Sequence, residues 1–485
     1  MKKAISRALR ALPLAILAFP PITGCGTTAP APPAPAPVTK ASDPVALQEN
    51  DRILVLVPHP DDEVLGAGGV LREAVRRGLP MRVVFLTHGD CNEWSFLAYR
   101  KRPVLMPGGA LAMGAIRRRE ALAAAAALGM PSADLTFLGY PDYGTLDIWR
   151  SHWGPGCPPD RGRLTRARAV PYETAFRPGA PFKGEEILTD LEAILREFRP
   201  TRIFVSHPAD HHPDHAALYL FTRVALWDLQ GEVSAALYPF LVHYPGWPRV
   251  KGFRASEELS PPDRLLAGFR WQSRELDSEE VDAKRAALAA HRTQYSYSAS
   301  RLLPFVRPNE LYGDLNIPVL VPEGGSVRLV EADGTEGTED SGEEELSASA
   351  DLAGLTVRRV RDQVEVTLDL QHPFSEGSTL SLSAFGYRPD RPFAAMPKLQ
   401  LRIELHSWTV RDQNRTLPRS AAWATVADRR LVARLPLASL EDPRRVFLQV
   451  RTGSRRSALG QTPWWIVELR PGMAMQRAAV GAASR

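Results

Sequence analysis

Between residues 51 and 320, apolar runs of strand length alternate with longer segments of helical periodicity. Repeated β-then-α order favours a parallel sheet with helices on both faces, because parallel strands need crossover connections. The sequence therefore predicts a three-layer, Rossmann-like α/β domain with a mostly parallel sheet. The predicted strands are 52–59, 81–87, 135–138 and 202–206, and the predicted helices are 66–78, 115–128, 185–198, 215–229 and 279–292.

The C-terminal region has a different pattern. Apolar and polar residues alternate over 364–370, 399–405 and 446–450, a period typical of half-buried antiparallel strands. We expect a β-sandwich-like domain over residues 351–485, preceded by an acidic linker at 321–350. Its tryptophans either line a sugar-binding face or, as the favoured alternative, pack in the core and between domains. They are Trp408, Trp423, Trp464 and Trp465.

The N-terminus is typical of an export signal. A basic start is followed by a short apolar stretch, and residues 22–25 (ITGC) resemble the lipobox of bacterial lipoproteins. This resemblance implies a signal peptide at 1–24, lipidation of Cys25 and a Pro/Ala-rich tether at 25–50, with ordinary secretion as the alternative. We expect an extracytoplasmic protein that contacts the membrane through a lipid anchor. Gly26 favours the outer membrane where the cell has one.

Charge and cysteine content exclude several classes of protein. The chain has 60 Lys and Arg against 55 Asp and Glu, a formal charge of +5 that is small for 485 residues, so a nucleic-acid partner is not expected. Three cysteines are too few for a disulfide scaffold or a four-cysteine zinc site. If Cys25 carries the lipid, two cysteines remain. Cys91 and Cys157 are then either joined in a disulfide or present as two free, buried thiols.

Histidine and aspartate are concentrated in two segments that each follow a predicted strand. Residues 58–63 read PHPDDE and residues 210–215 read DHHPDH. Ligands bind beyond the carboxyl ends of parallel strands, so both segments are expected at one edge of the sheet. A single such cluster is more often a cap or hydrogen-bonding group, but two clusters favour a site. Imidazole and carboxylate groups suit Zn²⁺, and two histidines with one carboxylate leave an open, catalytic position.

With these two segments, the sequence resembles the PIG-L/LmbE-like de-N-acetylases, whose hallmarks are PHPDDE and a later HPDH. Further similarity lies at 118–129, at 137–142 and around Lys284 and His291, so the resemblance covers roughly 52–295. It implies Zn²⁺, or another divalent transition metal, as the cofactor, and an N-acetylated sugar or glycan as the substrate. The implied metal ligands are His59, Asp62 and His215.

The resemblance also implies two catalytic side chains, Asp61 as general base and His212 as the group that stabilises the oxyanion. Asp214 is expected to orient His212 or His215 as a supporting carboxylate. Three more residues are candidates for support or substrate binding: Asp210, which stands where some members have tyrosine, Glu63 and Arg119.

The sequence thus predicts a zinc-dependent hydrolase that removes N-acetyl groups from N-acetylglucosamine-type sugars or glycoconjugates. Two alternatives stay open. One is a non-catalytic lipoprotein that binds glycan, and the other is the same hydrolase acting on a non-sugar amide.

Overall fold

The computed structural model describes residues 45–101, 106–322, 324–331, 352–454 and 458–470. The predicted signal peptide, Cys25, most of the predicted tether and the acidic run at 336–345 lie outside these residues. Among the described residues, no helix is both long and apolar enough to cross a bilayer.

A five-stranded sheet forms the centre of the first domain, and all of its strand pairs are parallel. The strand order reverses between β1 and β4, so this is the topological switch point of the sheet. Ligands of such sheets bind at the carboxyl ends of the strands at the switch point. The predicted Rossmann-like α/β fold is confirmed. In spatial order the strands are β3 (Leu135–Tyr140), β2 (Met81–Thr87), β1 (Ile53–Val57), β4 (Arg202–Ser206) and β5 (Ala236–Phe240).

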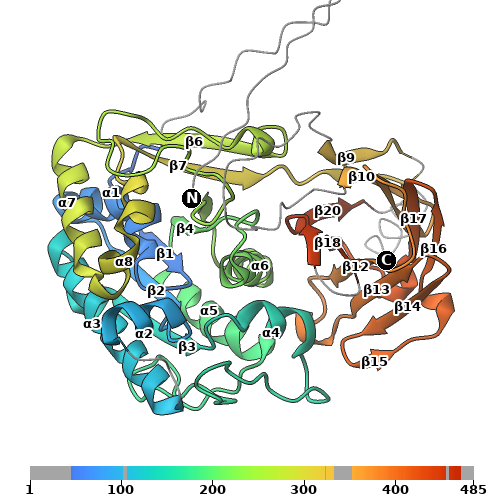
Figure 1. Ribbon diagram of the computed structural model, residues 1–485, viewed down its shortest axis with the longest axis horizontal. Coiled ribbons are helices and arrows are strands. Elements are labelled where there is room, and N and C mark those ends of the chain that lie inside the picture. Colours follow the sequence, from blue (N-terminus) through green and yellow to red (C-terminus); the bar gives the residue numbers. More distant parts are fainter. Residues whose placement is uncertain (1–44, 102–105, 323, 332–351, 455–457, 471–485) are drawn as a thin grey trace, which may run out of the picture. The chain divides into compact units, whose positions relative to one another are not determined.

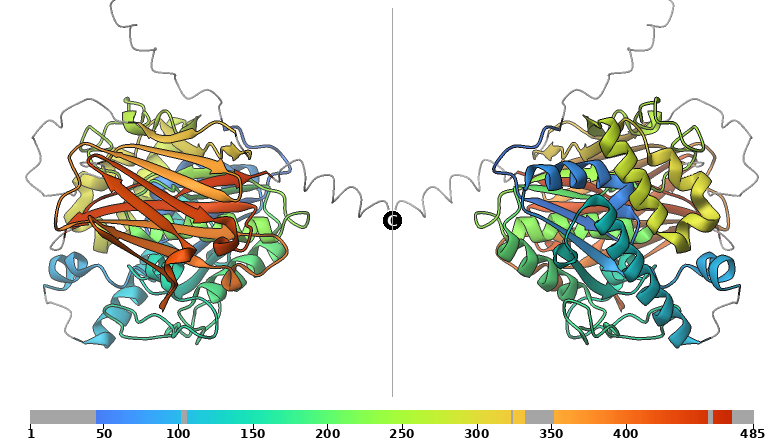
Figure 2. Two further views of the ribbon diagram at one scale, coloured as in Figure 1. Left: turned by 90° about the vertical axis from the view of Figure 1, so that its right-hand side faces the viewer. Right: turned by 90° about the vertical axis from the view of Figure 1, so that its left-hand side faces the viewer.

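Helices cover both faces of this sheet, as Figure 1 and the right-hand view of Figure 2 show. Along β1, Ile53 and Val55 belong to the core beneath one helix layer, whereas Leu54 and Leu56 belong to the core on the other face. The first layer contains α1 (Asp62–Arg77), α3 (Pro107–Leu128) and α7 (Ser278–Ala290), and the second contains α4 (Thr145–Ser151), α5 (Gly184–Phe198) and α6 (Pro213–Asp228). The remaining elements are α2 (Glu93–Arg100), α8 (Arg292–Leu302) and the hairpin of β6 (Phe269–Glu275) and β7 (Asn309–Leu315).

Helix α1 begins at Asp62, earlier than the predicted start at Gly66. The glycines after Glu63 lower helix propensity, but tertiary packing requires them. A Cβ on Gly66 would lie 2.3 Å from the Phe240 ring, because β5 passes close to the helix. The two acidic residues of the first turn also complement the helix dipole.

The C-terminal region consists mainly of antiparallel strands in two sheets, seen face-on in the left-hand view of Figure 2. This confirms the predicted β-sandwich-like architecture. One sheet has the order β16-β17-β11-β10-β9, namely Trp423–Ala427, Arg430–Pro436, Gln363–Leu370, Leu352–Val360 and Val327–Glu331. The other has the order β15-β14-β13-β12-β18-β20-β8, namely Arg415–Thr416, Ser407–Asp412, Lys398–Glu404, Ser378–Tyr387, Arg445–Ser454, Trp465–Leu469 and Val319–Leu320, with β19 (Ala458–Gln461) beside β18. Strand β9 lies inside the range predicted as linker.

The two domains share one continuous apolar core. Trp149 at the end of α4 is fully buried, and its ring lies 5.0 Å from that of Phe393 and 5.2 Å from that of Phe447. Trp464 and Trp465 are buried as well, which supports packing rather than an open sugar-binding face for these two rings. Trp423 differs from them, because 40% of its surface is exposed.

Candidate active site

The two histidine- and aspartate-rich segments meet at the carboxyl ends of β1 and β4. These strands are parallel neighbours with Leu56 opposite Val205, so the residues that follow them are brought to the same edge. Ligand atoms of His59, His212 and His215 lie within 4.8 Å of one another. The structure therefore places side chains from both segments in one cluster.

The three predicted ligands meet at one carboxylate oxygen, that of Asp62, with the two histidines on either side. Oδ2 of Asp62 lies 3.2 Å from Nδ1 of His59 and 3.2 Å from Nε2 of His215. Although burial opposes ionisation, the nearby His215 and His59 rings hold the pKa of Asp62 well below its usual value. Asp62 is therefore ionised, as a metal ligand must be.

The donor set fits a transition metal. His215 is fully buried, and its Nε2 makes no hydrogen bond of acceptable geometry within the described part of the chain. Buried polar atoms without partners are costly, and a metal would satisfy Nε2 of this ring. Two imidazoles and one carboxylate are a common ligand set for catalytic zinc.

Asp210 holds His215 from the opposite side. Its Oδ2 lies 3.2 Å from Nδ1 of His215 and accepts the backbone N–H groups of Val242 and His243, each at 2.9 Å. Burial opposes ionisation, but His215 and these bonds lower the pKa of Asp210 to about 2. A carboxylate bound to the outer nitrogen of a metal-ligating histidine fixes the ring and its tautomer.

Asp214 has a different partner from the two expected for it. Its carboxylate accepts the N–H groups of Tyr143 at 2.6 Å and Thr145 at 3.1 Å, and lies 3.2 Å from Nε2 of His59. The distance to Nδ1 of His212 is 4.0 Å, so Asp214 orients His59 rather than His212. This happens because Asp214 lies in the first turn of α6, beside the loop that follows β3.

Asp61 is held in an unfavourable backbone conformation beside the cluster. Its φ of 124° is one that L-residues rarely adopt. Its N–H donates to Oε2 of Glu63 at 2.9 Å, while Oε1 of Glu63 lies 2.8 Å from Nε2 of the buried His291. Arg117 donates to the carbonyl of Pro60 at 2.6 Å and lies 3.4 Å from Oδ1 of Asp61. Burial raises the pKa of Asp61 to about 7, against the lowering effect of Arg117.

His212 stands at the N-terminus of α6 with its ring 4.5 Å from that of His59 and 4.3 Å from that of Tyr143. Its Nδ1 accepts the N–H of Asp214 at 3.3 Å and so caps the helix. A ring that accepts at Nδ1 carries its proton on Nε2. Neutral His212 is thus already a hydrogen-bond donor, and stabilising an oxyanion does not require a protonated ring.

Comparison with known proteins decides the family. The sequence profile described as "PIG-L: GlcNAc-PI de-N-acetylase" matches residues 54–226. A deacetylase for 1D-myo-inositol 2-acetamido-2-deoxy-alpha-D-glucopyranoside from Mycobacterium sp. (strain KMS) is 30% identical over 262 residues, covering 51% of this chain and 76% of that protein. The chain belongs to the PIG-L family.

Two further proteins are similar to this chain. A protein of the same description from Mycobacterium sp. (strain JLS) is 29% identical over 317 residues, which cover 62% of this chain and 91% of that protein. The solved N,N'-diacetylchitobiose deacetylase from Pyrococcus horikoshii is 20% identical, with a TM-score of 0.31 over 50% of this chain and 70% of its own. Membership of the PIG-L family confirms the prediction of a hydrolytic N-deacetylase.

Two side chains of this PIG-L site were not predicted from the sequence to be functional. Oδ1 of Asp142 lies 3.2 Å from Nε2 of His59, and His243 forms a possible ligand group with Asp62 and His215. Asp142 follows β3 and His243 follows β5, so the strand-end rule that found the two dense segments also applies to them.

The structure separates the arginines of α3. Arg117 is buried beside Asp61, whereas Arg119, the candidate from the sequence, is exposed on another face of the helix. In the described part of the chain, Arg119 forms no hydrogen bond or ion pair with the clustered histidines. Successive helical residues are about 100° apart, so these two side chains point to nearly opposite sides.

Cys91 and Cys157 are free thiols. The N–H of Cys91 donates to Oδ2 of Asp142 at 2.7 Å, and Sγ of Cys157 lies 3.2 Å from Oε1 of Gln413. Of the two alternatives for this pair, the structure has two thiols and no disulfide.

Proposed function

We propose that the protein is a zinc-dependent hydrolase that removes the N-acetyl group from a 2-acetamido-2-deoxyglucose unit in a glycoside or glycan. The observation that carries this proposal is the position of Asp61. Its carboxyl group is held next to the ligand triad by Glu63 and Arg117 but belongs to none of the possible ligand groups of the described residues. The two mycobacterial relatives are named as deacetylases of such a glucoside, which supports the sugar substrate.

His59, Asp62 and His215 would hold the metal, and Asp210 and Asp214 would orient the two histidines. Bound Zn²⁺ supplies Lewis acidity, which lowers the pKa of water to about 7 and polarises a carbonyl group. Iron or cobalt suits the same ligands, so the zinc assignment is part of the proposal.

Asp61 moves the proton. Its free carboxylate oxygen accepts a proton from the attacking water as the new C–O bond forms at the acetyl carbon. It then returns this proton to the amide nitrogen as the C–N bond breaks, which gives acetate and the free amino sugar. Glu63 and Arg117 keep the carboxylate in position through both steps.

His212 binds the oxygen that becomes negative. Because Nδ1 accepts the Asp214 N–H, Nε2–H is the donor available to the carbonyl oxygen of the acetyl group. Its hydrogen bond strengthens as negative charge develops, which lowers the barrier to attack.

We also propose that the enzyme works outside the cytoplasm, anchored through a lipid on Cys25. The support is the sequence alone: a basic start, a short apolar stretch and the lipobox-like residues 22–25. Cells that express the full chain and its Cys25→Ala variant test this proposal. Labelled fatty acid incorporated into the first protein and absent from the second is the expected result, and equal labelling or none in either contradicts it.

The deacetylase proposal is tested with the purified full chain in detergent. We expect about one equivalent of zinc and acetate release from N-acetylglucosaminides. His215→Ala should lose both, and the exposed His372→Ala is the matched control. Zinc binding without acetate release from any acetylated sugar would refute the activity. Absence of metal after zinc is supplied would favour the non-catalytic glycan-binding alternative, and release from non-sugar amides alone would refute the sugar substrate.

A further inference from the structure

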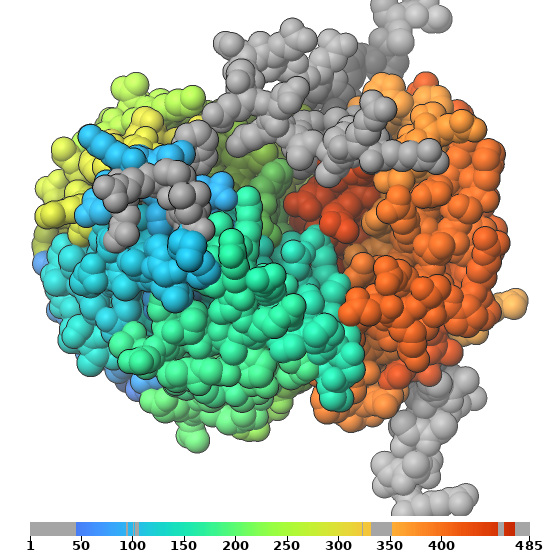
Figure 3. Space-filling view, turned by 60° about the horizontal axis from the view of Figure 1, so that its bottom comes forward, coloured from blue at the N-terminus to red at the C-terminus, as the bar shows by residue number. Residues whose placement is uncertain are grey.

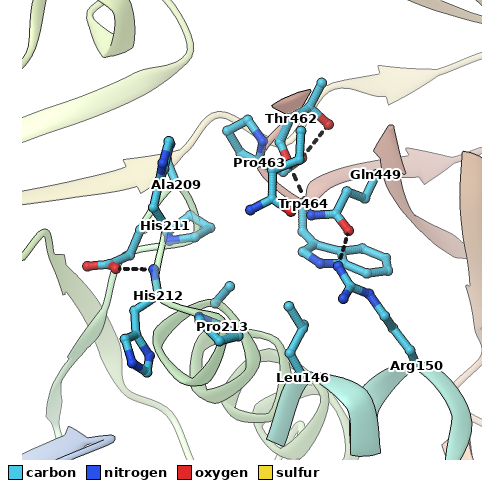
Figure 4. Close-up of a pocket in the computed structure, with 14 residues that line it drawn as sticks. Leu146, Arg150, Ala209, His211, His212, Pro213, Gln449, Thr462, Pro463 and Trp464 are labelled. Carbon is cyan, nitrogen blue, oxygen red and sulfur yellow. Dashed lines mark hydrogen bonds between the residues drawn. The ribbon is translucent and has the colours of Figure 1, made fainter. Parts of the chain in front are cut away.

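A pocket of about 230 Å³ lies where the two domains meet, next to His212. Its walls are the start of α6, one side of α4, and the chain between β18 and β20 of the sandwich (Figure 4). In the space-filling view, the red segment that includes part of these sandwich residues lies in a hollow between the green and orange parts of the surface (Figure 3). The β-sandwich therefore supplies part of a pocket that begins at the active site.

Two hydrogen-bond donors in the wall of the pocket lack acceptors among the described residues. The Arg150 side chain is only 12% exposed, and its Nη2 donates to Oε1 of Gln449 at 2.8 Å. Its Nε is buried without a partner among the described residues, and so is the indole Nε1 of Trp464, whose side chain is fully buried. Arg150 and Trp464 both line the pocket. Buried donors without acceptors are rare in native structures and point to a missing partner.

Positive charge around Arg150 is poorly compensated. Its nearest carboxylate is that of Asp147, 3.9 Å away on a side chain that is 69% exposed. Arg451 is two residues from Gln449 on the same face of β18, and its Nε is also buried without a partner. Burial and the Arg451 charge lower the pKa of Arg150 to about 9. Asp210, the carboxylate in the pocket wall, is already occupied by backbone N–H groups and His215.

We propose that this pocket is a second subsite that binds an anionic group, a carboxylate or phosphate, on the unit next to the acetylated sugar. The inference deepens the proposed function and rests on it, because His212 forms part of both sites. Guanidinium groups match carboxylate and phosphate oxygens in geometry and charge. The pocket is smaller than the roughly 300–1,000 Å³ typical of sites for whole drug-sized ligands, so it suits one substituent or ring.

Binding is tested in the full chain with Zn²⁺ and the Asp61→Asn substitution, so that turnover does not interfere. Three probes are compared by calorimetry: N-acetylglucosamine linked to glucuronate, to glucose 6-phosphate and to glucose. We expect at least one anionic probe to bind about ten- to a hundredfold more tightly than the neutral one, the range for a charge-assisted hydrogen bond. Which of the two anionic probes binds more tightly distinguishes carboxylate from phosphate.

Adding Arg150→Gln should abolish this preference while leaving the neutral probe unaffected. Arg402→Gln on the exposed side of β13 is the control and should retain it. Where Arg150→Gln does not fold, Gln461→Glu, which introduces a carboxylate into the pocket wall, should abolish the preference as well. Equal binding of all probes, binding of none, or a preference that survives these substitutions would overturn the inference. Failure of the proposed function is distinct, since wild-type protein would then release no acetate from any probe.

Discussion

Asp61 combines an unfavourable backbone conformation with a carboxyl group beside the predicted ligands. A φ of 124° costs of order 1–3 kcal/mol, and Glu63 stabilises it by accepting the Asp61 N–H. Removing this acceptor in Glu63→Ala should misplace the base without removing a ligand. We expect kcat to fall about a hundredfold, in line with a misplaced catalytic group, with zinc content unchanged. Steady-state kinetics and metal analysis check this, with exposed Glu93→Ala as the control. Loss of zinc would instead assign Glu63 to the metal centre.

His212 is close enough to the triad to be a ligand, so its role needs a separate test. As an oxyanion donor, it should retain zinc in His212→Ala while kcat falls about a hundred- to a thousandfold. The same change removes the N-cap of α6, so the free energy of unfolding should fall by about 0.5–2 kcal/mol. Metal analysis, kinetics and denaturant unfolding measure the three quantities. Zinc loss in step with activity would make His212 a ligand and contradict the proposed mechanism.

At the scale of elements, helix α1 depends on its glycines for contact with its neighbours. A Cβ on Gly66 would lie 2.3 Å from Phe240, and overpacking of this kind costs about 1–3 kcal/mol. Gly108, near the start of α3, has open space around its Cβ position. Gly66→Ala should therefore lower the free energy of unfolding, whereas Gly108→Ala should raise it by up to about 1 kcal/mol. Urea unfolding of both variants checks the contrast, and equal effects would contradict it.

The elements that could be predicted from sequence are those whose pattern is set by the sheet itself. Continuous apolar runs revealed β1, β2 and β4, because these strands are buried on both faces. Strand β5 was missed although its residues are apolar, because it contains Pro239 and proline argues against a central strand. Helix α2 was also missed, since no helix was predicted between residues 87 and 115.

The candidate site was predictable to the same extent. Two dense segments follow strands that were recognised, so their meeting at one sheet edge followed from the predicted topology. Asp142 and His243 occur singly, and His243 follows the strand that was missed. The carboxylate positions depend on loop geometry that sequence patterns do not specify, which is why Asp214 contacts His59 instead of its expected partners.

At the scale of the whole molecule, the shared core makes the two domains depend on each other. Trp149 belongs to the α/β domain but packs against Phe385, Phe393, Phe447 and Trp464 of the sandwich. The core on the α4, α5 and α6 face of the sheet is thus continuous with that of the sandwich, although the core on the other face belongs to the α/β domain alone. We therefore expect the full chain to unfold in one cooperative transition rather than two.

Trp149→Ala tests this dependence, because it removes a fully buried ring from the shared core. Large-to-small changes of this kind lower the free energy of unfolding by about 3–5 kcal/mol. We expect one transition in which both domains unfold, at a lower midpoint temperature than in the wild-type protein. Differential scanning calorimetry follows the transition, while fluorescence of the remaining tryptophans, which lie in both domains, shows whether the two unfold together. Trp423→Ala, at a ring that is 40% exposed, should change stability far less. Two transitions, of which only one moves, would show that the sandwich folds independently and that the pocket beside His212 joins two separately stable domains.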